Sequence, residues 1–157
     1  MTVNMSDAAD WETPLWHRTG FRLIKLGELV QATTARLFES FEINSRQYHV
    51  LSAAAALGTP SQKELSRVLG VDPNVMVGLV DDLESRGLAE RVRNPEDRRR
   101  YIVTPTDRAR QLLEQCDKAV SEVEKALFEE LSEPERRQLH EVSGRMLTSN
   151  PRVTKHE

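Results

Sequence analysis

The stretch Arg91-Val-Arg-Asn-Pro-Glu-Asp-Arg-Arg-Arg-Tyr-Ile-Val-Thr104 decides the fold of this 157-residue chain. Its Asn-Pro pair favours a turn between two strand-like runs, so the pattern predicts strands over 88–93 and 99–104. The window 86–110 holds eight arginines against four acidic residues, a local charge of +4, whereas the whole chain carries −3. One basic surface on an otherwise acidic chain is typical of a protein that touches nucleic acid with a single face.

Three helix-start signals lie upstream of this stretch, and each is followed by a glycine that can end a helix. The starts are Asn44-Ser-Arg-Gln47, Ser61-Gln-Lys-Glu64 and Asp72-Pro73, and the stops are Gly58, Gly70 and Gly87. The second and third helices are short and joined by a tight turn. We therefore expect a helix-turn-helix that leads directly into the two strands.

Long amphipathic helices are predicted on both sides of this centre. Thr13-Pro14 is a helix-entry signal, and apolar residues recur every seven positions along residues 14–40. After the strands, Thr106 can cap a helix over 107–130, and the capping box Ser132-Glu-Pro-Glu135 opens a last helix. Because the N-terminal seam is long for a small domain, it needs a partner helix. The recurring residues of that seam are Trp16, Leu23, Val30 and Leu37.

These signals divide the chain into four parts. We expect terminal dimerisation helices on either side of a DNA-binding lobe, followed by a short tail. The parts are 1–40 (N-terminal dimerisation helix), 43–106 (lobe), 107–149 (C-terminal dimerisation helices) and 150–157 (tail).

The composition excludes several classes of protein. A single cysteine rules out an intrachain disulfide, and the four histidines have no zinc-ligand spacing. No apolar run approaches the roughly 18 residues of a membrane span, and the N-terminus lacks a signal-peptide pattern. The chain also lacks a nucleophile motif, a phosphate-binding glycine loop or a credible carboxylate pair. We expect a cytoplasmic protein that is not an enzyme and uses no metal or cofactor.

Residues 43–109 resemble the winged helix-turn-helix of the MarR family of bacterial transcription regulators. Three segments carry the resemblance, and the last matches the family's wing signature. They are Gln62-Lys-Glu-Leu-Ser-Arg-Val-Leu-Gly-Val-Asp-Pro73, Leu79-Val-Asp-Asp-Leu-Glu-Ser-Arg-Gly-Leu88 and Asn94-Pro-Glu-Asp-Arg-Arg-Arg-Tyr-Ile-Val-Thr-Pro-Thr106. The resemblance implies a mainly α fold with a β-hairpin wing, acting as a homodimer on a pseudo-palindromic duplex DNA operator. It also implies a repressor relieved by a small phenolic or anionic ligand.

The resemblance assigns roles to the wing. Asp97 matches the carboxylate that braces an arginine, Arg99, which points at the minor groove. Arg98 and Arg100 are the neighbouring wing arginines, placed near phosphate or groove. The alternative is that these charges only solvate a turn.

The predicted recognition helix departs from the family, because no arginine or lysine lies on its outward face. By helical spacing the candidate base-contact residues are Asn74, Val75, Val77 and Gly78, with Asp81 and Asp82 further along. The valines can meet thymine methyl groups, which favours an A·T-rich operator. Affinity should then depend on the wing and on phosphate contacts from Lys63 and Arg67.

Three further hypotheses remain open. The glycine and the two aspartates on the recognition helix also suit a winged helix that has lost DNA readout and binds protein instead. A polar-aromatic set on the first two helices suits a small ligand between the dimerisation helices and the lobe, although the tryptophan can equally pack in a dimer core. The set is Trp11, Trp16, His17, Arg22, Tyr48 and His49. Cys116 raises a redox-sensor hypothesis, but it lies on the apolar seam of its helix, where a thiol is typically unreactive.

Overall fold

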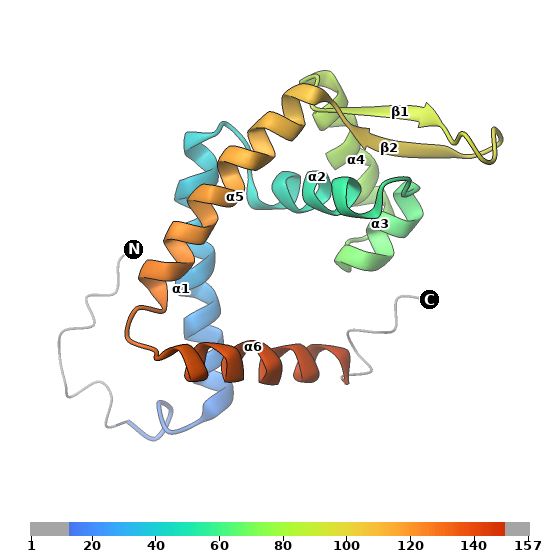
Figure 1. Ribbon diagram of the computed structural model, residues 1–157. Coiled ribbons are helices and arrows are strands. Elements are labelled where there is room, and N and C mark those ends of the chain that lie inside the picture. Colours follow the sequence, from blue (N-terminus) through green and yellow to red (C-terminus); the bar gives the residue numbers. More distant parts are fainter. Residues whose placement is uncertain (1–12, 150–157) are drawn as a thin grey trace.

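The structure, a computed structural model, describes residues 13–149. It is mainly α-helical with one two-stranded antiparallel hairpin, as expected (Figure 1). The elements in chain order are α1 (Thr19–Ser40), α2 (Ser45–Leu57), α3 (Gln62–Leu69), α4 (Pro73–Ser85), β1 (Ala89–Arg93), β2 (Tyr101–Pro105), α5 (Asp107–Leu127) and α6 (Glu133–Thr148).

The predicted helix starts of the lobe are confirmed by their hydrogen bonds. At the start of α2, the Asn44 side chain accepts from the Gln47 amide at 2.9 Å, and Gln47 Oε1 accepts from the Asn44 amide at 2.8 Å. Ser61 and Glu64 form the same reciprocal box before α3. Such boxes satisfy backbone donors that a helix start leaves unpaired. The stops are confirmed too, since Gly58, Gly70 and Gly87 all have positive φ.

The hairpin is shorter at its turn end than the sequence predicts. β2 begins at Tyr101, not at residue 99. The Asn94 amide donates to Arg100 O at 2.8 Å, and the Arg100 amide donates to Asp97 O at 2.9 Å. The first of these bonds closes the hairpin across Asn94 and Arg100, so residues 95–99 form the turn and Arg99 is not a strand residue.

The N-terminal helix also begins later than predicted, at Thr19 rather than near Pro14. Thr13 does not act as its cap. The Trp16 amide donates to Thr13 O at 3.0 Å in a separate turn before the helix. Arg18 then adopts an extended backbone, with φ −90° and ψ 119°, which interrupts any continuous helix.

The core lies where α2, α4 and the hairpin meet the C-terminal part of α1 and the N-terminal part of α5. The recognition helix faces inward as its spacing predicts, with Met76, Val80 and Leu83 fully buried. The other fully buried large side chains are Phe38, Val50, Leu51, Leu65, Val103 and Cys116. This core fixes the orientation of α3, α4 and the hairpin as one lobe.

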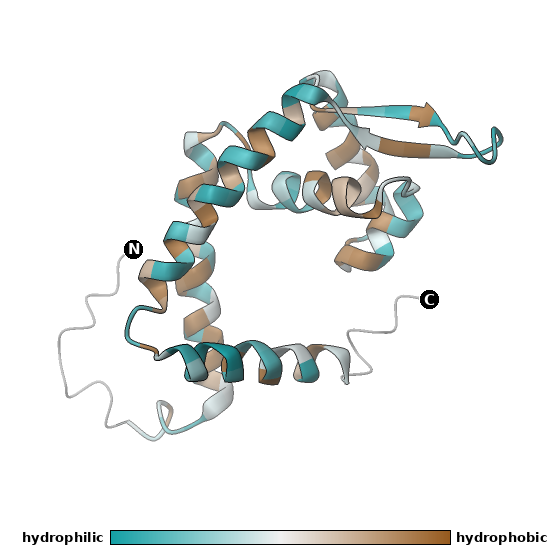
Figure 2. Cartoon of the chain, viewed as in Figure 1, coloured by the Kyte–Doolittle hydropathy of each residue, from teal (hydrophilic) through white to brown (hydrophobic). Residues whose placement is uncertain are grey.

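Helix α6 projects away from the α1–α5 pair (Figure 1) and contains no buried residue. Its preceding helix, α5, ends at Leu127, three residues before the predicted end. Apolar residues remain exposed along α1 and near the end of α6, and Figure 2 shows brown segments along α1. They are Leu23, Ile24, Leu26, Leu29, Met146 and Leu147. No described helix is both long and apolar enough to cross a membrane.

Candidate nucleic-acid interface

The residues that helical spacing places on the outward side of α4 are exposed in the structure. Val75 and Val77 are 42% and 45% exposed, and Asn74 and Gly78 are exposed beside them. The helix start is held by Asp72, whose carboxylate accepts from the Asn74 amide at 2.8 Å. On this side α4 therefore offers methyl groups and one amide side chain, and no cation. The candidate phosphate contacts on α3, Lys63 and Arg67, are exposed as well.

The carboxylates of α4 are held by side chains from other elements. Asp82 accepts a hydrogen bond from Gln47 Nε2 of α2. Asp81 and Glu84 both accept from the guanidinium of Arg91 on β1. The negative charge that suggested a protein-binding winged helix is thus largely engaged within the lobe.

The wing turn is built around two side chains that accept from backbone amides. Asn94, almost fully buried, accepts from the Glu96 amide at 2.8 Å through its side-chain oxygen. Asp97 accepts from the Arg99 amide at 3.1 Å. Among the described residues Asp97 forms no ion pair with the Arg99 guanidinium, so any bracing here acts through the backbone.

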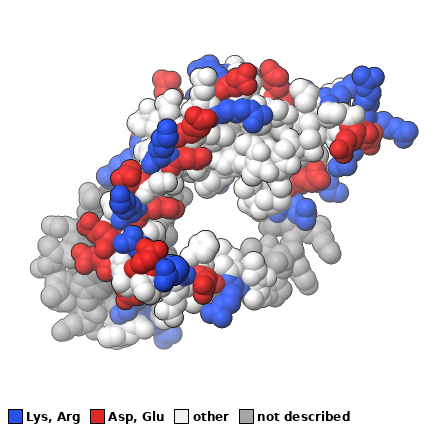
Figure 3. Space-filling model, viewed as in Figure 1, with Lys and Arg blue, Asp and Glu red and all other residues white. Residues whose placement is uncertain are grey.

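The arginines near the hairpin fall into two groups. Arg93 donates to Arg98 O at 2.7 Å and lies over the Tyr101 ring, and Arg100 lies 3.8 Å from Glu64. In the described part of the chain, the side chains of Arg98 and Arg99 have no hydrogen-bond or ion-pair partner. Figure 3 shows blue side chains gathered at the hairpin end of the molecule. Of the described arginines in the hairpin, the two without a partner therefore lie at its tip.

Other arginines of the basic window have structural contacts that the sequence pattern did not reveal. Arg86 donates to Glu42 O and to Gln47 Oε1, the latter at 3.3 Å. Arg108 donates to Arg86 O at 3.2 Å. These contacts tie the end of α4 to α2 and α5. Charge counting alone cannot separate such arginines from those available to DNA.

The candidate ligand residues are not brought together within one chain. Arg22 donates to Trp16 O at 2.5 Å near the start of α1, and His17 is exposed in the turn before it. Tyr48 and His49 lie on α2, beside the other end of α1, with ring centroids 5.7 Å apart. The length of α1 separates the two groups by about 25 Å. Trp11 lies outside the described residues.

Tyr48 links three helices. Its ring stacks on Phe38 of α1 at a centroid distance of 4.5 Å, and its hydroxyl donates to Asp117 of α5 at 2.7 Å. Burial, together with this bond to a carboxylate, raises the pKa of Tyr48 to about 12. The phenol therefore stays protonated and joins the lobe to the terminal helices.

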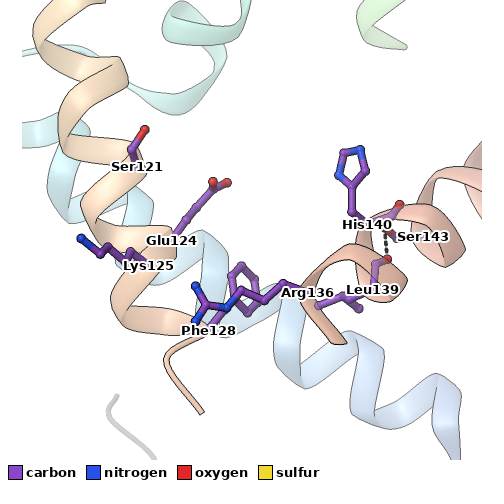
Figure 4. A pocket seen from close by; sticks show the side chains of 8 residues that line it. All are labelled: Ser121, Glu124, Lys125, Phe128, Arg136, Leu139, His140 and Ser143. Atoms are coloured by element: carbon purple, nitrogen blue, oxygen red, sulfur yellow. Dashed lines mark hydrogen bonds between the residues drawn. The ribbon is translucent and has the colours of Figure 1, made fainter. Parts of the chain in front are cut away.

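A cavity of about 440 Å³ lies between the end of α5 and α6 (Figure 4). Its wall includes the cations Lys125 and Arg136, with the aromatic ring of Phe128 beside them. Arg136 is oriented by its own Nε, which donates to Leu131 O at 2.9 Å. The carboxylate of Glu124 also lines the cavity, so its wall carries charges of both signs beside an apolar surface. None of its lining residues was among the predicted ligand set.

Reactive chemistry has little support in the described residues. Cys116 is fully buried, and burial raises the pKa of its thiol, which disfavours the reactive thiolate. No group of three or more His, Cys, Asp or Glu side chains within residues 13–149 is arranged to hold a metal ion.

A helix-turn-helix followed by a basic hairpin defines the winged-helix class of DNA-binding proteins. Sequence comparison narrows this class. A model of the MarR family matches residues 43–101. The multiple antibiotic resistance protein MarR of Salmonella typhimurium is 31% identical over 101 residues, which cover 60% of this chain and 70% of that protein. The chain belongs to the MarR family of transcriptional regulators.

Other relatives agree with this assignment. The HTH-type transcriptional regulator YdgJ of Bacillus subtilis is 34% identical over 86 residues, which cover 55% of this chain and about half (52%) of that protein. CouR from Rhodococcus jostii RHA1, solved bound to p-coumaroyl-CoA, superposes with a TM-score of 0.79 at 27% identity and covers 86% of this chain and 95% of its own. A mutant MarR from E. coli, complexed with operator DNA, gives a TM-score of 0.74 at 25% identity, with coverages of 90% and 99%.

Proposed function

We propose that this regulator is a homodimer that binds a pseudo-palindromic DNA operator sequence-specifically and represses transcription until a small ligand releases it. The observation that carries the DNA-binding part is the pair of arginines at the tip of the hairpin that follows α4, Arg98 and Arg99, whose side chains have no partner among residues 13–149. A helix of this kind fits the major groove, where base edges are distinguishable. A hairpin next to it reaches the minor groove or the backbone, where arginines meet concentrated negative potential.

The homodimer is supported by apolar surface that one chain leaves uncovered. Leu26 of α1 is 36% exposed and lines an apolar groove of about 570 Å³ together with the end of α5, the loop after it and the first part of α6. Leu23 and Leu29, on the same helix, are 44% and 50% exposed. A second copy would cover these residues and give α6 a packing partner. It would also present two recognition helices to half-sites about one helical turn apart.

Titration of the purified protein against duplex DNA tests the DNA-binding part of the proposal. The probes are the intergenic DNA upstream of its own gene and duplexes selected from a random pool. Competitor-resistant binding that weakens steeply with salt is expected, because phosphate contacts release counterions. If selection enriches no sequence and the upstream DNA binds no better than random DNA, the proposal of sequence-specific binding is wrong.

The valines of α4 should contact thymine methyl groups. Replacing contacted thymines of the selected operator by uracil removes only those methyl groups, and each lost contact should weaken binding about fourfold, since burial of one methyl is worth about 0.8 kcal/mol. Val75→Ala and Val77→Ala proteins should be less sensitive to the same replacement. Equal sensitivity of the wild-type and variant proteins would show that the methyl groups are not read by these side chains.

A small anionic or phenolic effector can be taken up in two places. The cavity between α5 and α6 offers Lys125, and the junction of α1, α2 and α5 offers Tyr48. Titration of the protein–DNA complex with salicylate, p-coumarate and p-coumaroyl-CoA would measure its release from DNA. Lys125→Gln should raise the releasing concentration about tenfold if the cavity is the site, since a charged hydrogen bond is worth about 1.5–3 kcal/mol; Lys118→Gln, on the same helix, is its control.

Tyr48→Phe is the corresponding variant for the junction. A shift with Tyr48→Phe and none with Lys125→Gln would place the effector between the lobe and the terminal helices instead. Release by none of the three compounds would remove the support for an effector of this chemistry.

A further inference from the structure

Arg91 is fully engaged by three acceptors, although the basic window in which it lies suggests a DNA contact. Its Nε donates to Gln62 of α3 at 2.7 Å, its Nη2 donates to Asp81 of α4 at 2.6 Å, and its Nη1 donates to Glu84. The Arg91 amide donates to the other oxygen of Glu84 at 2.7 Å. One side chain of β1 therefore holds both helices of the helix-turn-helix.

The contacts of Arg91 matter for DNA binding because α4 is negatively charged. The helix Pro73–Ser85 contains Asp81, Asp82 and Glu84 and no basic residue. The side chain of Asp81 is 59% exposed, so its carboxylate would be free to face phosphate if nothing held it. The Arg91 side chain is only 24% exposed, between that carboxylate and Glu84. A carboxylate near a DNA backbone is repelled, and this cost grows where water is excluded.

We propose that Arg91 is a positioning residue for DNA binding: it turns the carboxylates of Asp81 and Glu84 toward the hairpin and offsets part of their negative charge, so that the recognition helix can approach phosphate. Through Gln62 it also sets the angle of the wing against α3. Bidentate and forked contacts of this kind are specific to the arginine guanidinium, because a lysine ammonium cannot hold three fixed acceptors at once. This inference rests on the proposed function, since it presupposes that α4 approaches DNA.

The test compares Arg91→Met, Asp81→Asn and the double variant on the operator selected by the wild-type protein. Arg91→Met removes the charge and keeps an apolar stem. We expect it to weaken binding at least tenfold, and we expect Asp81→Asn in the same protein to restore affinity to within about threefold of wild type. Asp81→Asn alone should change little. If Arg91→Met does not fold, Arg91→Lys is the milder substitution to test, and we expect it to weaken operator binding by an intermediate amount.

Other results would overturn the proposal in identifiable ways. If Arg91 contacted phosphate itself, Arg91→Met would flatten the salt dependence by about 0.9 per lost contact, and Asp81→Asn would not restore binding. If Arg91 only stabilised the fold, thermal denaturation would show a lower Tm in Arg91→Met, and the second substitution would leave DNA binding impaired. An unchanged affinity in the methionine or lysine variant would also refute the positioning role. Failure of the wild-type protein to bind any duplex would refute the proposed function instead.

Discussion

Arg98→Glu combined with Arg99→Glu should reduce operator affinity about 1,000-fold or more at about 0.15 M salt, because a dimer would lose about four phosphate contacts, each releasing about 0.9 counterions. These two side chains have no described intramolecular partner, so their reversal removes interactions with DNA and none within the chain. The repulsion introduced by the glutamates adds to the loss. Titration at several salt concentrations measures both the affinity and the slope.

The control for this variant is Arg137→Glu combined with Arg145→Glu, which changes the net charge equally on α6, away from the hairpin. Far-ultraviolet circular dichroism and Tm should be unchanged in the wing variant, because exposed charges contribute little to stability. If the α6 variant stays dimeric by sedimentation and loses as much affinity as the wing variant, the loss comes from net charge. If the wing variant binds as tightly as wild type, the wing has no part in DNA binding.

The helix boundaries of the lobe were predictable because their signals are local. Asn44 with Gln47 and Ser61 with Glu64 satisfy each other within one turn, so spacing along the chain is enough to find them. The inward and outward faces of α4 follow from helical periodicity for the same reason. Gly70 ends α3 with φ 63°, a left-handed backbone conformation for which glycine is the favoured residue.

What the sequence could not show are contacts between elements far apart in the chain. Arg91 and Gln62 are separated by 29 positions, and Arg86 and Glu42 by 44, so no local pattern links them. A count of arginines treats all eight alike. Among the described residues, the side chains of five of them have partners, whereas those of Arg98 and Arg99 at the wing tip and of Arg110 on α5 have none. The predicted start of α1 was also wrong. The Thr13-Pro14 signal begins a separate short turn, and the extended backbone of Arg18 ends that turn before α1 begins.

The predicted ligand set shows the limit of grouping residues by chemistry alone. Trp16 lies in the turn before α1 and Tyr48 lies on α2, so the two residues are held near opposite ends of α1. The cavity beside Phe128 arises where α5 ends and α6 turns away, a geometry that depends on the loop 128–132. The role of each candidate residue in ligand binding stays a prediction. The second large effect on operator binding is expected from the exposed apolar residues of α1.

Leu26→Glu is expected to convert the dimer into a monomer and to weaken operator binding by about 100-fold or more. The leucine lines the apolar groove that we assign to the second copy, and a carboxylate buried there without a partner costs several kcal/mol. A monomer binds one half-site and loses the gain that comes from linking two sites, which is typically 100-fold or more. Sedimentation should give the mass of one 17.9 kDa chain instead of two.

Gln31→Glu is the matched control, because it adds the same charge to an exposed position on another side of α1. It should remain dimeric and bind the operator normally. A Leu26→Glu protein that stays dimeric would show that the groove lies outside the interface. A monomeric protein with wild-type affinity would show that one lobe is sufficient, and two linked recognition helices would no longer explain binding. Loss of dimer and affinity together, with the lobe still folded, is the result that connects the exposed seam of α1 to DNA recognition.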